Sequence, residues 1–438
     1  MTSGQERTSR TTRLRRRLLS LGAGLLVVGG AFGAGYRAAT PSRTVSWDVY
    51  RQARLFDRVV SKVRTDYVDS VSEAGLYTEA TRQVVASLND PYAELLLGDE
   101  FRAFNDQLAG KELGVAGGAA SASRLVHASA AKHPFLLGDG VGYLELRAMT
   151  ERSAGEVRDS IDRLRGSGMR ALVLDLRYNP GGLIEQGVAI ADLFLDAGDT
   201  IAVLKGRNPR HTRTYLAKRA QRWPDLKLAV LVGPNTASAA ELLAGALQDH
   251  GRAVVVGTRT YGKGVVQTTY TLEEDAAVKL TTSRWYMPSG RSVQRPPADE
   301  VEGDTASTWG LAPDMRVGAR RHTPEERDLL RALGADVALF RETLDGYAAG
   351  LVRAGLVRRP DAVVTARMRA QLYLRVRASG LWLSEETWER GRTYVDRELG
   401  YALAHAAGDA ADEFRRRAAD DPPLRSAVTA LAEPLGAE

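Results

Sequence analysis

The sequence predicts an α/β protein whose layered core lies between an N-terminal helical segment and a C-terminal helical region. Three apolar runs of strand length, at residues 171–176, 228–232 and 253–256, are typical of strands buried on both faces. Segments with helix-period apolar residues alternate with these runs, and strand-like runs end near residue 320. Strands that alternate with helices indicate an α/β layer structure.

The chain divides into five predicted regions. Residues 1–45 form a basic stub with an apolar segment, 46–112 read as helices, and 113–137 are a linker rich in Gly, Ala and Ser. Residues 138–317 are the α/β core, and 318–438 are charged, helix-period sequence. Within the core we expect strands at 142–146, 171–176, 228–232 and 253–256, and helices at 154–164, 183–195 and 237–247.

Composition narrows the class of protein. Of the 438 residues 44% are hydrophobic and 26% are charged, which is the balance of a chain that fills a core and excludes disorder over most of its length. The absence of cysteine excludes disulfides, thiolate metal sites and cysteine nucleophiles. The net charge is +6, and six arginines between residues 7 and 17 contribute much of it.

These arginines precede an uncharged run at residues 18–36. The length of this run is close to the ~20 residues that a membrane-spanning helix needs. Such a cluster orients a membrane segment more often than it binds nucleic acid, so we predict a membrane contact and no nucleic acid. Only Arg37 and Arg43 follow closely, which places residue 1 in the cytosol and the rest outside. We favour an uncleaved anchor; a cleaved signal peptide and a twin-arginine signal are the alternatives.

Three turns rich in small residues each follow a buried strand, at residues 179–182, 235–241 and 261–264. The third fits the pattern G-x-x-x-x-G-K of a phosphate-binding loop at residues 257–263. That loop needs a hydroxyl residue next and then a helix, but Gly264 and a β-branched, strand-like run follow. We therefore set the nucleotide-hydrolase interpretation aside.

Lys263 fits a general base better. Gly262 and Gly264 on either side allow close backbone approach. A lysine with an ordinary pKa near ~10.4 cannot accept a proton at neutral pH, but burial disfavours its charged form and lowers that value. Lys263 could then activate a serine hydroxyl.

Ser238 is the matching candidate nucleophile. It follows an apolar strand at the predicted start of a helix, between small neighbours that include Ala237 and Ala239. Backbone N–H groups at a helix start can hold an oxyanion. Taken alone, Ser238 reads more simply as a helix N-cap and Asn179-Pro-Gly-Gly182 as a turn.

Taken together, the three turns resemble the tail-specific, or C-terminal processing, protease family (S41-type serine peptidases) over residues 88–317. Six motifs match in order and at family spacing. They are Leu-Asp-Leu-Arg-Tyr-Asn-Pro-Gly-Gly at 174–182, Thr-Ala-Ser-Ala-Ala-Glu at 236–241, Ala-Leu-Gln-Asp at 246–249 extending to Gly257, Thr-Tyr-Gly-Lys-Gly-Val-Val-Gln at 260–267, Pro-Ser-Gly-Arg-Ser-Val-Gln at 288–294 and Gly-Leu-Ala-Pro-Asp at 310–314.

The resemblance implies a multi-layer crotonase/ClpP-like core and a serine endopeptidase that acts on protein or peptide substrates through an acyl-enzyme. It implies that Ser238 is the nucleophile, Lys263 the base and Gln267 the residue that orients the lysine. It also implies an oxyanion hole built from the amides of Gly182 and Ala239, with Gly181 as a further candidate, and it implies no metal or cofactor. The resemblance suggests that the substrates are exported proteins, which are cut near their C-termini. It also suggests that the catalytic part lies on the periplasmic side of a bacterial inner membrane.

Family members usually carry a PDZ domain before the core, and this chain departs from that pattern. Only 23 residues separate Gly114 from Gly138, too few for several strands and a core. Because such domains capture substrate C-termini by strand addition, C-terminal selectivity is in doubt. We expect the protein to form a homo-oligomer. We also expect either an adaptor protein or the C-terminal helices to deliver the substrate. The alternative functions are a non-catalytic scaffold and a protease that a partner activates.

Overall fold

The structure, a computed structural model, describes residues 47–108, 129–296 and 309–432. The predicted anchor at 18–36 lies outside these residues. Among the helices that the structure does describe, none combines the length and the apolar character that crossing a bilayer requires. The chain separates into two compact units, Met1–Val84 and Val85–Glu438, which are described in turn.

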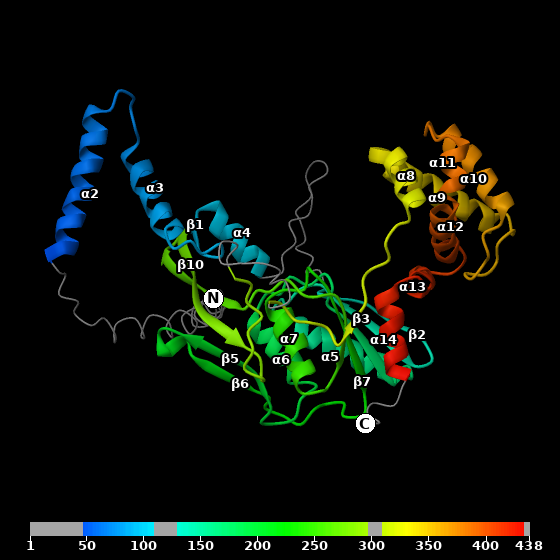
Figure 1. Cartoon of the computed structure of the whole chain (residues 1–438), viewed down its shortest axis with the longest axis horizontal. Helices are drawn as coiled ribbons and strands as arrows, with labels where there is room; N and C mark the ends of the chain where they lie inside the picture. Colours follow the sequence, from blue (N-terminus) through cyan, green and yellow to red (C-terminus); the bar gives the residue numbers. More distant parts are fainter. Residues whose placement is uncertain (1–46, 109–128, 297–308, 433–438) are drawn as a thin grey trace, which may run out of the picture. The chain divides into compact units, whose positions relative to one another are not determined.

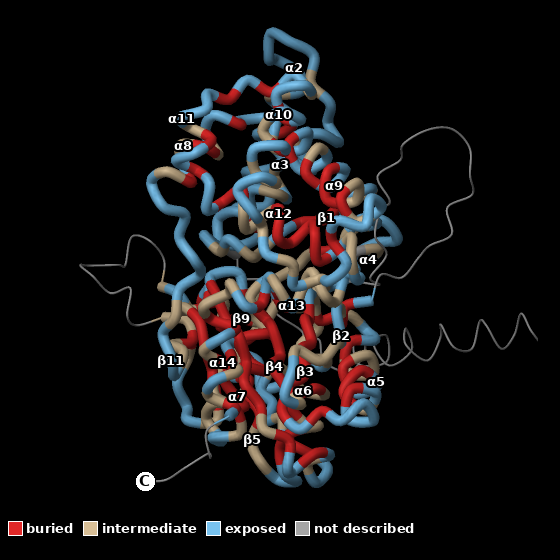
Figure 2. The backbone as a smooth tube through the Cα atoms, turned by 90° about the vertical axis from the view of Figure 1, so that its right-hand side faces the viewer, coloured by how far each residue is buried: buried red, intermediate tan, exposed pale blue. Residues whose placement is uncertain are grey.

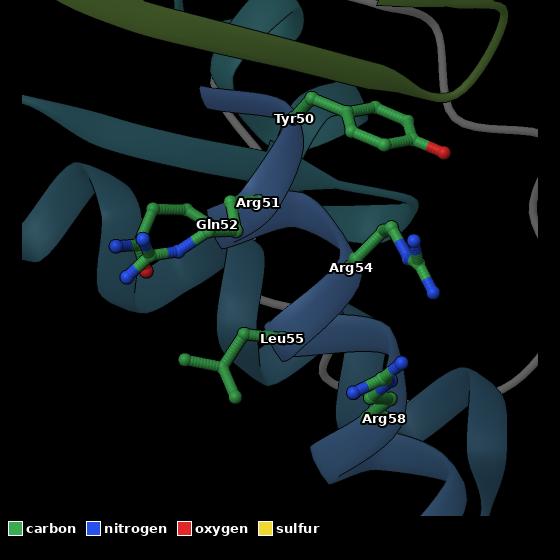
Figure 3. A pocket seen from close by; sticks show the side chains of 6 residues that line it. All are labelled: Tyr50, Arg51, Gln52, Arg54, Leu55 and Arg58. Atoms are coloured by element: carbon green, nitrogen blue, oxygen red, sulfur yellow. The ribbon is translucent and has the colours of Figure 1, made fainter. Parts of the chain in front are cut away.

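The described part of the first unit is helical, in agreement with the sequence. Helix α2 (Trp47–Asp66) and helix α3 (Glu73–Ala86) contact each other through the rings of Phe56 and Tyr77, whose centroids are 5.8 Å apart. A hollow on α2 is lined by six residues from that helix alone, including Arg51, Arg54 and Arg58 (Figure 3). It gathers no groups from separate parts of the chain, so we assign it no chemistry.

The second unit is built around a six-stranded sheet in the order β11-β8-β7-β4-β3-β2 (Figure 1). Neighbouring strands from β3 to β11 are parallel, and β2 pairs antiparallel with β3 at one edge. The expected buried strands are all present, so the α/β class is confirmed. The strands are β2 (Ala131–Gly138), β3 (Val141–Leu146), β4 (Ala171–Asp175), β7 (Lys227–Val232), β8 (Val254–Gly257) and β11 (Met315–Arg316).

Helices cover both faces of this sheet. Successive side chains of a strand point to opposite faces, and in β4 Leu172 and Leu174 join one hydrophobic cluster while Ala171 and Val173 join another. The first cluster includes side chains of α5 (Ser153–Gly166), α6 (Ile184–Ala191) and α7 (Ala239–Asp249). The second includes side chains of α13 (Ala410–Ala419) and α14 (Pro422–Ala432), which lie beside the sheet (Figure 1).

A second, antiparallel sheet forms a further layer, of which the sequence indicated only the strand after Lys263. Its residues Ile201, Leu204 and Trp285 share one hydrophobic cluster with α7, whose first nine residues are all buried. Helix α4 (Asp99–Leu108) follows its first strand. The strands are β1 (Glu94–Leu97), β5 (Thr200–Gly206), β6 (Arg213–Leu216), β9 (Val265–Glu273) and β10 (Ala276–Tyr286).

The C-terminal helices before α13 form a bundle with its own hydrophobic cluster (Figure 2). The buried carboxylate of Glu326 accepts hydrogen bonds from Arg397 at 2.7 Å and Arg320 at 3.0 Å. Burial alone would raise the pKa of Glu326, but Arg397 and His322 hold it at about 2. The helices are α8 (Pro324–Leu333), α9 (Val337–Arg353), α10 (Ala366–Ala378), α11 (Glu385–Arg390) and α12 (Arg392–Ala407).

Three elements form or cover the sheet although the sequence assigned them to neighbouring regions. Strand β2 falls in the predicted linker at 113–137, yet its pairing with β3 makes it part of the sheet. Helices α13 and α14 fall in the predicted C-terminal region, yet Leu424 and Ala427 pack against the sheet. The division of the chain at residues 138 and 318 stays a prediction, as does the absence of a PDZ domain.

Candidate active site

Ser238 stands at the sharp turn between β7 and α7, where the sequence placed it. Its backbone has φ 57° and ψ −122°, and only three other described residues besides glycine have a positive φ. A residue with a side chain is strained in this conformation, and such strain concentrates at functional sites. A strained strand-to-helix turn is also the way in which α/β-hydrolases expose a nucleophilic serine.

This turn is fastened to the end of β4. Thr236 Oγ1 donates to the carbonyl of Leu176 at 2.7 Å and accepts from the Gly233 N–H at 3.0 Å. The Ala237 N–H donates to the carbonyl of Asn179 at 3.0 Å. Thr236 and Asn179 are fully buried, so these bonds are shielded from water and hold the first two turns together.

Gly181 lies directly against Ser238. A Cβ atom on Gly181 would be 2.8 Å from Ser238 Cβ and 3.0 Å from the Ala239 nitrogen, and its φ of 93° also disfavours a side chain. The Gly181 N–H already donates to Asn179 Oδ1 at 2.9 Å. The remaining candidates for an oxyanion hole are therefore the amides of Gly182, an exposed residue, and of Ala239, the first residue of α7.

Glu241 connects the turn that carries Ser238, at residues 235–241, to the turn that carries Lys263, at residues 261–264. These are called the nucleophile turn and the lysine turn below. Its Oε2 accepts from the backbone N–H of Ser238 at 2.9 Å and from that of Lys263 at 2.8 Å. Its Oε1 accepts from the Gly262 N–H at 2.8 Å and from Thr260 Oγ1. The amide nitrogens of Ser238 and Lys263 are therefore at most about 5.7 Å apart, the sum of the two bonds to Oε2. Burial raises the pKa of Glu241, and these four bonds oppose that effect.

The backbone of the lysine turn is held on its other side as well. The Trp285 indole donates to the carbonyl of Lys263 at 3.1 Å, and the Gly264 N–H donates to Gln294 Oε1 at 2.8 Å. A Cβ on Gly264 would be 2.8 Å from the Gln294 nitrogen, so a serine or threonine does not fit there. Strand β9 begins at Val265, where a phosphate-binding loop would need a helix. Both observations exclude that loop.

The side chain of Lys263 lies over the ring of Tyr92, with Nζ 4.8 Å from the ring centroid. Burial lowers the pKa of Lys263 below its ordinary value, and the neighbouring Lys279 lowers it further. Asp90 and Glu241 act in the opposite direction without reversing the shift. The direction is the one that a lysine needs to act as a base near neutral pH.

Gln267 does not contact Lys263 in this arrangement. It lies on β9, and its Nε2 donates to Thr281 Oγ1 on β10 at 3.2 Å. Among the described residues, Lys263 Nζ lies over the Tyr92 ring and forms no hydrogen bond with Ser238 Oγ. The backbones of the candidate dyad are thus brought together, whereas the side chains of Gln267 and Lys263 are directed to other partners.

An open cleft of about 500 Å³ lies at this point. Tyr92, Tyr178 and Tyr261 contribute aromatic walls, and the side chain of Lys263 reaches the cleft. Its remaining lining residues are Pro180, Asn235 and Ala237, which belong to the first two turns. The cleft therefore brings the side chain of Lys263 and residues of the first two turns to one surface.

The other motif residues have structural partners. Arg177 joins Asp175 on β4 to Asp421 before α14, with nitrogen–oxygen distances of 2.7 Å to each. Gln248 donates to Asp314 Oδ1 at 2.6 Å, and Asp314 Oδ2 accepts from the Val255 N–H at 2.7 Å. These motifs fix the ends of strands and helices around the site.

Two residues of this site were not predicted. In the sequence Glu241 is only the last residue of a matching motif, and Tyr92 lies in none of the six motifs. Three of the four partners of Glu241 lie about 20 residues further along the chain, and contacts at that separation leave no mark in a sequence. An acidic residue on a helix that otherwise buries only apolar side chains was the available signal.

Comparison with known proteins finds relatives that share the part of the chain carrying these turns. The model of "Peptidase family S41" matches residues 140–317, which contain all three turns. A carboxy-terminal-processing protease of Bartonella bacilliformis is 35% identical over 214 residues, 48% of this chain and 44% of that protein. A protein of Staphylococcus epidermidis named "Probable CtpA-like serine protease" is 36% identical over 156 residues, 35% of this chain and 31% of that protein.

Among solved structures, a photosystem II D1 C-terminal processing protease aligns with 60% of this chain and 92% of its own, at 21% identity and a TM-score of 0.41. The match covers less than half of each of the two curated relatives. Residues 140–317 of the chain therefore resemble peptidase family S41.

Proposed function

We propose that this protein is a serine endopeptidase in which Ser238 and Lys263 form a catalytic dyad. The observation that carries the proposal is the shared carboxylate of Glu241, which accepts from the backbone N–H of both residues at 2.9 and 2.8 Å. A serine and its base must be held close together for proton transfer, and a common buried anchor supplies that geometry. The match to the S41 family model and the lowered pKa of Lys263 support the same assignment.

In the proposed reaction the neutral amine of Lys263 takes the hydroxyl proton of Ser238 as its oxygen attacks a peptide carbonyl. The amides of Gly182 and Ala239 stabilise the resulting oxyanion. The ammonium of Lys263 then gives the proton to the departing amine, which leaves an acyl-enzyme on Ser238. Water, deprotonated by Lys263, hydrolyses this ester and restores both groups.

The dyad is tested by measuring the cleavage of casein by the full chain and by its Ser238→Ala and Lys263→Ala variants. We expect the parent to cleave casein and each variant to lose at least about a thousandfold in rate, because nucleophile and base act as one unit. Ser289→Ala, a serine on an exposed turn of the same unit, serves as the control and should cleave like the parent. Activity that survives in Ser238→Ala would contradict the proposal.

A partner-activated form of the same protease is the second candidate, because Lys263 and Gln267 are directed to Tyr92 and Thr281. In that case the purified parent leaves casein intact and does not react with a serine-directed fluorophosphonate. Adding an extract of the source cells would restore labelling to the parent but not to Ser238→Ala. Labelling of the purified parent without any addition would exclude the need for a partner.

We propose that the substrates include exported proteins, which are cut near their C-termini. The reaction would take place on the outer side of a bacterial inner membrane. The uncharged run at 18–36 behind six arginines supports this location. Alkaline extraction should leave the full chain in the membrane fraction. Release of the chain into the soluble fraction would contradict an uncleaved anchor.

A further inference from the structure

Tyr92 is the aromatic residue that meets the candidate base, and its position is set by a turn rather than by a helix or strand. The turn follows α3 and precedes β1. The Tyr92 N–H donates to Asp90 Oδ1 at 2.9 Å, and the Ala93 N–H donates to the Asp90 carbonyl at 3.1 Å. Strand β1 then pairs with β10. The ring is therefore presented from a fixed backbone, with Lys263 Nζ 4.8 Å from its centroid.

An aromatic ring attracts an ammonium group through its quadrupole, and it has no such attraction for a neutral amine. The contact with Tyr92 therefore stabilises the charged form of Lys263. Asp90 and Glu241 also favour that form, whereas burial and Lys279 oppose it. Lys279 is itself paired with Glu94 at 2.6 Å, which moderates its effect. Tyr92 thus belongs to the groups that keep Lys263 protonated.

Tyr92 remains a neutral phenol while it does so. Burial raises its pKa to about 12, and the neighbouring Tyr261 contributes to the rise. Both tyrosines line the cleft beside Lys263. Tyr92 therefore faces the ammonium as a neutral ring.

We propose that Tyr92 is a positioning residue that holds the Lys263 ammonium at the cleft wall and so sets the pH at which Lys263 becomes a base. This inference rests on the proposed function, in which Lys263 takes the proton of Ser238. It also explains why Nζ faces a ring in the free enzyme: the contact is lost when the lysine gives up its charge and turns to the serine.

The effect of Tyr92 on the titration of Lys263 is tested directly by competitive labelling of lysines with acetic anhydride at a series of pH values. The extent of labelling is measured by mass spectrometry. The full chain carries Ser238→Ala so that no proteolysis or acylation of the serine interferes. Tyr92→Phe keeps the ring, and Tyr92→Leu keeps an apolar cover without the ring. Lys218, an exposed lysine of the same unit, is the internal reference.

We expect Lys263 to titrate alike with Tyr or Phe at position 92. With Leu the neutral fraction of Lys263 should be about two- to fivefold larger at any pH below its midpoint, which is the loss of a cation–π contact of ordinary strength. Equal titration in all three proteins would overturn the proposal. If Tyr92→Leu fails to fold, Tyr92→Met offers the same comparison with a more adaptable side chain.

The pH profile of kcat/KM with Ser238 in place separates this inference from the proposed function. The acidic limb should move to lower pH in Tyr92→Leu and stay in place in Tyr92→Phe, because that limb reports the essential base of the free enzyme. A shift in labelling without a shift of this limb would show that Tyr92 holds Lys263 but that Lys263 is not the base. In that event the dyad assignment fails and the contact with Tyr92 stands.

Discussion

At the scale of single residues, one buried carboxylate, that of Glu241, connects the two members of the proposed dyad. Glu241 accepts two hydrogen bonds on each oxygen, and its four donors come from both the nucleophile turn and the lysine turn. Hydrogen bonds to a charged acceptor are stronger than those between neutral groups. Glu241 therefore fixes the position of the Ser238 backbone relative to that of Lys263.

Glu241→Gln tests this dependence, because an amide has one carbonyl oxygen and its NH₂ group must face two donors in either orientation. We expect the free energy of unfolding to fall by about 2–4 kcal/mol, from lost hydrogen bonds in a buried site. Casein cleavage should fall at least tenfold under conditions where the protein is still folded. Urea unfolding and the cleavage rate measure the two effects.

Glu185→Gln makes the same chemical change at an exposed position on α6 and should alter neither quantity appreciably. If Glu241→Gln behaves like Glu185→Gln, the carboxylate does not carry the alignment of the two turns. The shared bonds to Oε2 would then be incidental to the chemistry.

At the scale of elements, periodicity predicted the helices and the parallel strands well. The expected helix at 154–164 is α5, Ser153–Gly166, and the expected strand at 228–232 is β7, Lys227–Val232. These elements are buried on one face or on both, so their sequences carry a strong period or a continuous apolar run. Their order along the chain was enough to predict the layered core.

The antiparallel sheet was largely missed for a physical reason. Strand β1 has four residues, Glu94–Leu97, and pairs with Lys279–Ala276 of β10, far along the chain. Half-exposed strands with mixed side chains have a weak period, and a partner so distant in sequence leaves no local signal. Tyr92 was missed with it, because its approach to Lys263 depends on the pairing of β1 with β10.

The candidate site was predicted in part from residues and in part from resemblance. Small residues after buried strands marked the three turns, and the family motifs assigned roles to Ser238, Lys263 and Gln267. The alignment of side chains could not be read in this way. The bond from Gln267 to Thr281 and the contact of Lys263 with Tyr92 arise from tertiary packing, which the motifs do not encode.

At the scale of the whole molecule, the last two helices belong to the core even though they follow the separate bundle of α8–α12. Leu424 and Ala427 of α14 share a hydrophobic cluster with Val173 of β4 and Leu231 of β7. Arg177 adds an ion pair to Asp421, directly before α14, and lies two residues before Asn179. Packing on this face of the sheet is therefore connected to the strand end that leads into the turn at residues 179–182.

Leu424→Ala tests whether α14 supports the core as a whole. Removing a fully buried leucine should lower the free energy of unfolding by about 2–4 kcal/mol, from lost burial and a residual cavity. Because the cluster includes β4 and β7, amide hydrogen exchange should accelerate in both strands as well as in α14. Arg425→Ala, the exposed neighbour on the same helix, should change stability by less than about 0.5 kcal/mol. Faster exchange confined to α14 would mean that this helix only covers the sheet, and that the C-terminal region could be removed without disturbing the site.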